Sequence, residues 1–363
     1  MASYARSVTI SRSSFHPCRG VVCRDGDRHA NHQAWQRGRS PRRYTVGVFG
    51  TLLFFGTALA LLLLILTAIL AREMTHPPRR TMSYALARGL PCDPGEMDLS
   101  YESWQFDRPD GALLPVWEIP GTARGGDGAD SHTDDEGLCV IFVHGWGQSR
   151  LDFLPLAAPW LPHAERVVLY DLRGHGEAER SRARLGDGEA EDLLALIERL
   201  DAKRVLLIGC SMGAVIALDA AAQTAEPAAR RIVGVIAYAP YTSFHRSLCG
   251  RLQRNHLPTR PVTDLALFGH MLFGVKPRSL DADRLRRIDC PVLVVHGERD
   301  IVSPIEHGCS VAETVKDAEL LRVPDGEHTM RDLVEAEGHA ERVEQLVAKV
   351  RGVAGGSRAT SHR

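Results

Sequence analysis

Residues 205–222 read VLLIGCSMGAVIALDAAA, and this stretch decides the fold. Its first four residues are apolar and typical of a buried strand, whereas residues 211–222 are typical of a buried helix. Between them lies GCSMG (209–213), the pattern G-x-S-x-G at a strand-to-helix turn. A serine on so sharp a corner is exposed, and the helix N-terminus directs free backbone N–H groups at an anion beside it. The stretch therefore predicts a nucleophilic Ser211, with a tight turn that has no catalytic role as the alternative.

Apolar runs and helical patterns alternate on both sides of this stretch. The predicted strands are residues 138–143, 166–170, 203–208, 232–238, 291–295 and 319–323, and the predicted helices are residues 189–200, 211–222, 304–315 and 330–350. Two strands over residues 98–106 and 113–119 are expected to form a hairpin before them. Short apolar strands separated by helices are typical of a parallel sheet with both faces covered. We therefore expect an α/β fold with a mostly parallel central sheet.

One segment interrupts this alternation. Residues 241–289 contain no strand pattern but carry many large apolar side chains. They include Phe244, Leu248, Leu252, Leu257, Leu265, Leu267, Phe268, Met271 and Phe273. We interpret the segment as a small helical insert that covers a pocket.

A serine hydroxyl needs a general base, and the base needs an acid that orients it. After a serine on such a turn, the acid and then the histidine follow along the chain. Asp300 follows the strand at 291–295, and His328 follows the strand at 319–323. Both loops lie at the carboxyl ends of strands, where open α/β sheets bind their ligands. Asp300 and His328 are therefore the expected acid and base.

Other side chains compete for these two roles. Glu298 lies two residues before Asp300, and Asp325 and Glu327 flank His328. Asp300 is favoured because it directly precedes the segment in which the next helix starts. Two further histidines, one at the end of a strand (296) and one on a helix (307), are interpreted as structural.

Acyl transfer also needs two backbone N–H donors aimed at the developing oxyanion. Met212, directly after the serine, is expected to supply one of them. The loop HGWGQ (144–148) follows the strand at 138–143 and is expected to supply the other from Trp146. The alternative is that this loop only makes a turn.

Five ordered motifs together resemble the α/β-hydrolase superfamily over residues 97–350. They are HGWG (144–147), YDLRGHG (170–176), GCSMG (209–213), HGERD (296–300) and GEH (326–328). Within the superfamily the chain is most similar to the membrane-anchored, prolyl-oligopeptidase-like branch of small serine hydrolases. The resemblance implies the fold and an acyl-enzyme on Ser211, but it says little about substrate. The chain lacks an HGGG loop, which argues against an esterase of the hormone-sensitive-lipase type.

The sequence predicts no metal site and no organic cofactor. It has no C-x-x-C pair, no zinc-like spacing of cysteine and histidine, no P-loop and no H-E-x-x-H. The buried-looking Cys139, Cys210 and Cys290 are interpreted as small apolar side chains.

Charge is distributed unevenly along a chain whose net charge is −1. Residues 1–80 hold 12 arginines against 3 acidic residues, whereas the remainder holds 32 basic against 42 acidic residues. The acidic remainder argues against a nucleic-acid-binding body, because neutralising phosphates needs a basic face.

An uncharged stretch covers residues 45–71 and is rich in leucine. A bilayer core of about 30 Å needs about 20 apolar residues in a helix, so this stretch is long enough to span. A signal peptide is the alternative, but its apolar region covers only about 7–15 residues. The sequence therefore predicts one transmembrane helix and a membrane as partner.

The remaining boundaries follow from composition. We expect a flexible basic arm over residues 1–44, a tether over 72–96, a hydrolase domain over 97–350 and a disordered tail over 351–363. A loop rich in glycine and aspartate is expected over 121–137. Five arginines precede the span closely and four follow it, which favours a single-pass protein with its catalytic domain on the non-cytoplasmic side.

These observations predict a serine hydrolase of the carboxylesterase or lipase-like kind, acting on a small hydrophobic ester. The membrane helix and the apolar insert favour a lipid-like ester. A peptidase or thioesterase of the same fold is the first alternative, and a non-catalytic, membrane-tethered binding module is the second. The oligomeric state does not follow from the sequence.

Overall fold

The computed structural model describes residues 42–122, 137–272 and 274–352. The chain divides into two units, Met1–Ala60 and Leu61–Arg363. Most of the predicted arm, of the loop over 121–137 and of the C-terminal tail lies outside the described residues.

Eight strands and eleven α-helices make up the described part of the chain. The strands are β1 Glu102–Asp107, β2 Leu113–Pro120, β3 Leu138–Val143, β4 Arg166–Tyr170, β5 Arg204–Cys210, β6 Ile232–Tyr238, β7 Val292–Gly297 and β8 Ala318–Val323. The helices are α1 Arg42–Thr75, α2 Met82–Leu86, α3 Arg150–Ala157, α4 Glu189–Arg199, α5 Met212–Ala221, α6 Phe244–Arg254, α7 Val262–Leu272, α8 Ala282–Leu285, α9 Ile305–Thr314, α10 Met330–Val334 and α11 His339–Val350.

The strands form one sheet in the order β1-β2-β4-β3-β5-β6-β7-β8. β1 pairs antiparallel with β2, β2 pairs antiparallel with β4, and the other pairs are parallel. This confirms the predicted α/β fold with a mostly parallel sheet.

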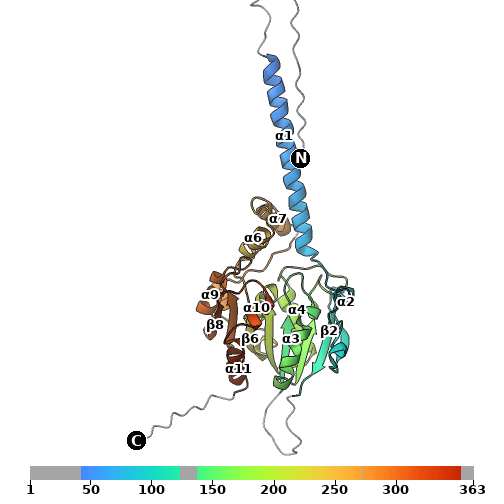
Figure 1. Ribbon diagram of the computed structural model, residues 1–363, viewed down its shortest axis with the longest axis vertical. Coiled ribbons are helices and arrows are strands. Elements are labelled where there is room, and N and C mark those ends of the chain that lie inside the picture. The colour runs from blue at the N-terminus through green and yellow to red at the C-terminus, as the bar shows by residue number, and fades with distance from the viewer. Residues whose placement is uncertain (1–41, 123–136, 273, 353–363) are drawn as a thin grey trace, which may run out of the picture. The chain divides into compact units, whose positions relative to one another are not determined.

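Helices cover both faces of the sheet (Figure 1). Side chains of β3 alternate between the two faces, with Ile141 in one apolar cluster and Phe142 in the other. Helices α4, α5 and α9 pack on the Ile141 face, whereas α3, α10 and α11 pack on the Phe142 face. The apolar strands that the sequence shows are therefore buried on both sides.

Three elements differ from the sequence expectations. β1 starts at Glu102 rather than at residue 98, because a 3-10 helix precedes it and Asp98 takes a left-handed φ of 58°. The helix expected over 330–350 is two helices, broken where Gly338 takes φ 77°. α3 was not predicted, and it contains Pro155, a residue that usually ends helices.

Helix α1 contains the apolar stretch of the sequence. Its segment Gly47–Thr75 is long and apolar enough to cross a membrane, and an 18-residue window within it has a mean hydropathy of 2.7. The helix continues past the predicted end of the span at residue 71 and through Arg72 and Glu73. The residues predicted as a tether also contain α2 and the 3-10 helix Pro94–Met97.

The predicted insert over 241–289 contains α6, α7 and α8 and no described strand. α6 and α7 lie together above the sheet, beside the strand ends that carry the site (Figure 1). A cluster of Met74, Leu185, Leu248 and Ala266 joins this region to the last turn of α1.

Candidate active site

Ser211 lies at the corner between β5 and α5. Its φ of 53° and ψ of −114° are a conformation that non-glycine residues rarely adopt, and such strain is concentrated at functional sites. The corner needs glycine at two neighbouring positions. A Cβ on Gly209 would lie 2.5 Å from the carbonyl oxygen of Gly213, and a Cβ on Gly213 would overlap the carbonyl oxygen of Val143. Residues 209–213 therefore pack α5 directly against the sheet and leave the serine side chain at the corner.

The structure brings Ser211, His328 and Asp300 into one hydrogen-bonded chain. His328 Nε2 lies 3.0 Å from Ser211 Oγ, and His328 Nδ1 lies 2.6 Å from Asp300 Oδ2. With a proton on Nδ1 donated to the carboxylate, Nε2 is free to accept the serine proton. The arrangement can thus activate the Ser211 hydroxyl as a nucleophile.

Asp300 is held in place by the backbone that follows it. Its Oδ1 accepts hydrogen bonds from the N–H groups of Val302 at 2.9 Å and Ser303 at 2.8 Å. Its side chain is fully buried, and its Oδ2 is left for His328.

The three competing carboxylates lie elsewhere. Glu298, Asp325 and Glu327 are all exposed. Glu298 faces Arg322 at 3.9 Å, and Asp325 pairs with Arg299 at 2.7 Å. None of the three bonds to His328, so the geometry favours Asp300 as its orienting acid.

Other reactive groups near the serine are kept neutral by burial. Burial raises the pKa of the Cys210 thiol to about 12, so it holds its proton at neutral pH. Burial lowers the pKa of His144 to about 4 and that of His175 to about 3. His144 Nε2 accepts from the N–H of Leu172 at 2.9 Å, which fits a structural role.

The two expected oxyanion donors flank Ser211. Met212 is the first residue of α5, so its N–H has no partner within the helix. The N–H of Trp146 has no hydrogen-bond partner among the residues that the structure describes. The loop that contains Trp146 is held by a hydrogen bond in which the N–H of Gly145 donates to Gln148 Oε1 at 2.7 Å. These amides are candidate donors to an oxyanion.

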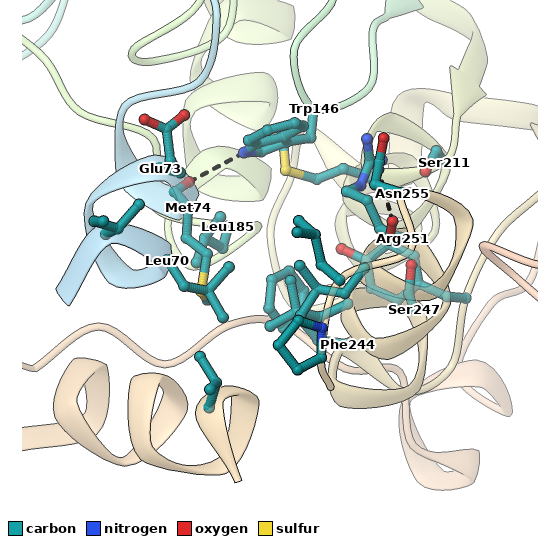
Figure 2. A pocket seen from close by; sticks show the side chains of 18 of the residues that line it. Leu70, Glu73, Met74, Trp146, Leu185, Ser211, Phe244, Ser247, Arg251 and Asn255 are labelled. Carbon is teal, nitrogen blue, oxygen red and sulfur yellow. Dashed lines mark hydrogen bonds between the residues drawn. The ribbon is translucent and has the colours of Figure 1, made fainter. Parts of the chain in front are cut away.

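The Trp146 side chain connects this loop to helix α1. Its indole Nε1–H donates to the carbonyl oxygen of Met74 at 3.1 Å (Figure 2). The guanidinium of Arg251 on α6 lies over the same ring, 4.7 Å from its centroid. One side chain of the candidate oxyanion loop therefore contacts both α1 and the insert.

Ser211 opens onto a cavity of about 390 Å³. Its walls come from the last turns of α1, from Trp146, Leu185 and Tyr241, and from α6 (Figure 2). Most of the lining is apolar. Its lining side chains with polar groups, besides Trp146 and Tyr241, are Glu73, Ser211, Ser247, Arg251 and Asn255. The cavity can hold an apolar chain with its reactive end beside the serine.

The sequence did not identify several of these lining residues. Glu73 and Met74 lie in the segment interpreted as a tether, and their contacts depend on the tertiary fold. Arg251 and Tyr241 lie in the insert, which the sequence marks only by its apolar residues. No pattern in the sequence distinguishes Arg251 from Arg246 and Arg254, the other arginines of α6.

Comparisons with known proteins agree with the fold and the kind of site. Residues 140–346, more than half of the chain, match the model of the alpha/beta hydrolase family. The pimeloyl-[acyl-carrier protein] methyl ester esterase of Chromobacterium violaceum is 28% identical, over 53% of this chain and 88% of its own length. The human serine hydrolase BPHL is 27% identical, over 51% of this chain and 70% of its own length.

A solved esterase from Pyrococcus furiosus has the same fold. It aligns with a TM-score of 0.58 at 22% identity, and the match covers 76% of this chain and 98% of the esterase. Together, the sheet order, the strand-to-helix corner and the family match lead to one conclusion. The chain belongs to the alpha/beta hydrolase family.

Proposed function

We propose that this protein is a membrane-anchored serine hydrolase that cleaves hydrophobic carboxylic esters. The observation that carries the proposal is the hydrogen-bonded chain Ser211–His328–Asp300, whose serine lines an apolar cavity. Esterase names among the similar proteins support ester chemistry without identifying a substrate.

The reaction proceeds through an acyl-enzyme. His328 Nε2 takes the proton of Ser211 while Oγ attacks the ester carbonyl carbon, and the N–H groups of Trp146 and Met212 bind the oxyanion. The C–O bond to the alcohol then breaks, and the alcohol leaves with the proton from His328. A water molecule, deprotonated by His328, attacks the acyl-enzyme and releases the acid and the free serine. Asp300 orients His328 and stabilises its charged form in both steps.

A series of 4-nitrophenyl esters of increasing acyl length tests this function. The full chain in a non-ionic detergent should show kcat/KM rising with acyl length, because each buried methylene contributes up to about 0.8 kcal/mol. Ser211→Ala should abolish hydrolysis at every length. Equal rates for short and long esters would contradict a hydrophobic substrate. Faster cleavage of a matched thioester or peptide amide would instead favour the alternative activities.

We propose that α1 anchors the chain as a single-pass helix, since its apolar segment has the length and hydropathy of a span. An arginine at the centre of such a helix costs about 2.5–3.5 kcal/mol on insertion scales. Leu62→Arg should therefore release protein into the soluble fraction on alkaline carbonate extraction, whereas Leu62→Ala should stay in the membrane. Equal retention of both variants would contradict anchoring by α1.

Two finer points stay predictions from the sequence. The arginine count places the catalytic domain on the non-cytoplasmic side, and protease protection in sealed vesicles measures that side directly. The resemblance to the prolyl-oligopeptidase-like branch does not identify the substrate.

A further inference from the structure

The cavity contains one arginine whose charge has no anionic partner. Arg251 lies on α6, lines the cavity with Ser211 and stacks over the ring of Trp146. Within the described residues its guanidinium forms no ion pair and no side-chain hydrogen bond, and it contacts the aromatic ring. The residue is half-buried, and an arginine stays charged at neutral pH, so its N–H donors are available to an anion in the cavity.

The surroundings of Arg251 do not neutralise it. Burial lowers the pKa of Arg251, and Arg254 lowers this pKa further. Asp300 raises the same pKa, but more weakly. Asp300 itself is occupied by His328 and by two backbone N–H groups. Glu73 is the one carboxylate among the described lining residues, and it lies across Trp146 from Arg251 (Figure 2).

The neighbouring Tyr241 does not supply an anionic partner for Arg251. Its hydroxyl oxygen is buried, without a hydrogen-bond partner among the described residues, and burial and then Glu189 raise its pKa, whereas Arg251 lowers that pKa more weakly. Arg251 is thus the one cationic side chain among the described lining residues, beside an apolar chamber.

We propose that Arg251 binds an anionic oxyacid group of the substrate, a carboxylate or a phosphate. Trp146 supplies a candidate oxyanion amide, and Arg251 stacks on its ring, so the anion lies a few bonds from the ester carbonyl. Because the apolar lining suits the acyl chain, the anion is assigned to the alcohol portion. The acyl chain then occupies the apolar part of the cavity against α1. The substrate class is an acyl ester of a small anionic alcohol. This inference rests on the proposed function for its reaction, but its binding test does not.

Direct binding tests the anion site without catalysis. We would titrate the full-length Ser211→Ala variant, in a non-ionic detergent, with octyl phosphate, octanoate and 1-octanol by calorimetry. At least one anion should bind about 10- to 100-fold more tightly than the alcohol, as expected for hydrogen bonds to a charged group. The preferred anion identifies the phosphate or the carboxylate as the ligand.

Variants at two positions of α6 assign the preference to Arg251. Adding Arg251→Gln should remove most of the preference, and Arg251→Lys should retain part of it because the charge remains. Arg254→Gln is the matched control, since Arg254 is exposed three residues further along the same helix. Equal affinity for anions and alcohol, or a preference that Arg251→Gln leaves intact, would overturn the proposal.

Hydrolysis then separates this inference from the proposed function. The wild-type chain should cleave 1-dodecanoylglycerol 3-phosphate or dodecanoyl glycerate faster than neutral 1-dodecanoylglycerol, and Arg251→Gln should reduce that ratio about 10- to 100-fold. Anion binding without any hydrolysis would contradict the esterase function and support the anion site. Hydrolysis whose rate does not depend on the charge of the substrate would support the esterase function and contradict the anion site.

Discussion

The two carboxylate oxygens of Asp300 have different partners. Oδ1 accepts two backbone N–H groups, and Oδ2 faces His328 Nδ1. The sequence predicted this residue from the order of acid and histidine after the serine and, against Glu298, from its place directly before the segment in which the next helix starts. Arg251 could not be predicted, since its solitary charge depends on which groups surround it in three dimensions.

Asp300→Asn should leave the fold intact and reduce activity severely. Its amide oxygen can keep the two backbone bonds, but its NH₂ group then faces Nδ1 and selects the tautomer that cannot take the serine proton. We expect kcat for a 4-nitrophenyl ester to fall about 10³- to 10⁴-fold, as for other triads. Glu298→Gln, which changes an exposed carboxylate two residues away, should change kcat less than about 2-fold. A comparable loss in both variants would contradict the assignment of the acid.

At the scale of elements, the sequence predicted the parallel strands and the main helices well, because apolar runs separated by helical periods dictate them. It failed at 330–350, where one amphipathic pattern continues through Gly338 although that residue breaks the helix. It also failed to show that the end of α1 forms a wall of the cavity. Arg72 and Glu73 look like the end of a span in sequence, and only packing reveals that Met74, directly after them, is buried.

The close approach of α5 to the sheet makes Gly213 a sensitive position. A Cβ there would overlap the backbone of β3, so Gly213→Ala should destabilise the fold by about 1–3 kcal/mol or more. Gly269 on α7 is the matched control, because a Cβ there would meet nothing within 4 Å. Gly269→Ala should be neutral or stabilising by up to about 1 kcal/mol. Thermal unfolding of both full-length variants in detergent measures the difference, and equal shifts in Tm would contradict this packing account.

For the whole molecule, pH should act on stability through buried groups that change their protonation on folding. Burial raises the pKa of Glu189 from 4.5 to about 8, although the N–H of Arg184 donates to it. The folded state therefore holds a proton on Glu189 that the unfolded chain has lost, and stability falls as pH rises through 4.5 to 8. Buried histidines such as His307, with a pKa of about 4, act oppositely, but only below their ordinary value of 6.5.

Between pH 6.5 and 8, the titration of Glu189 should therefore dominate the contribution of these buried groups to the pH dependence of stability. We expect the wild-type free energy of unfolding to fall by about 2 kcal/mol over this range, at about 1.4 kcal/mol per pH unit. Glu189→Gln should flatten the curve, because an amide does not titrate. Urea unfolding of both proteins across the range measures the two slopes. Parallel slopes would show that Glu189 is ionised in the folded protein.

The central claim is that the whole chain assembles an activated serine at position 211. A fluorescent fluorophosphonate probe tests it most directly, because the activated oxygen bonds to phosphorus as fluoride leaves. The full-length chain in detergent should label, Ser211→Ala should not, and peptide mass spectrometry should place the adduct on Ser211. A folded parent chain that does not label, or a Ser211→Ala variant that labels equally, would contradict the account.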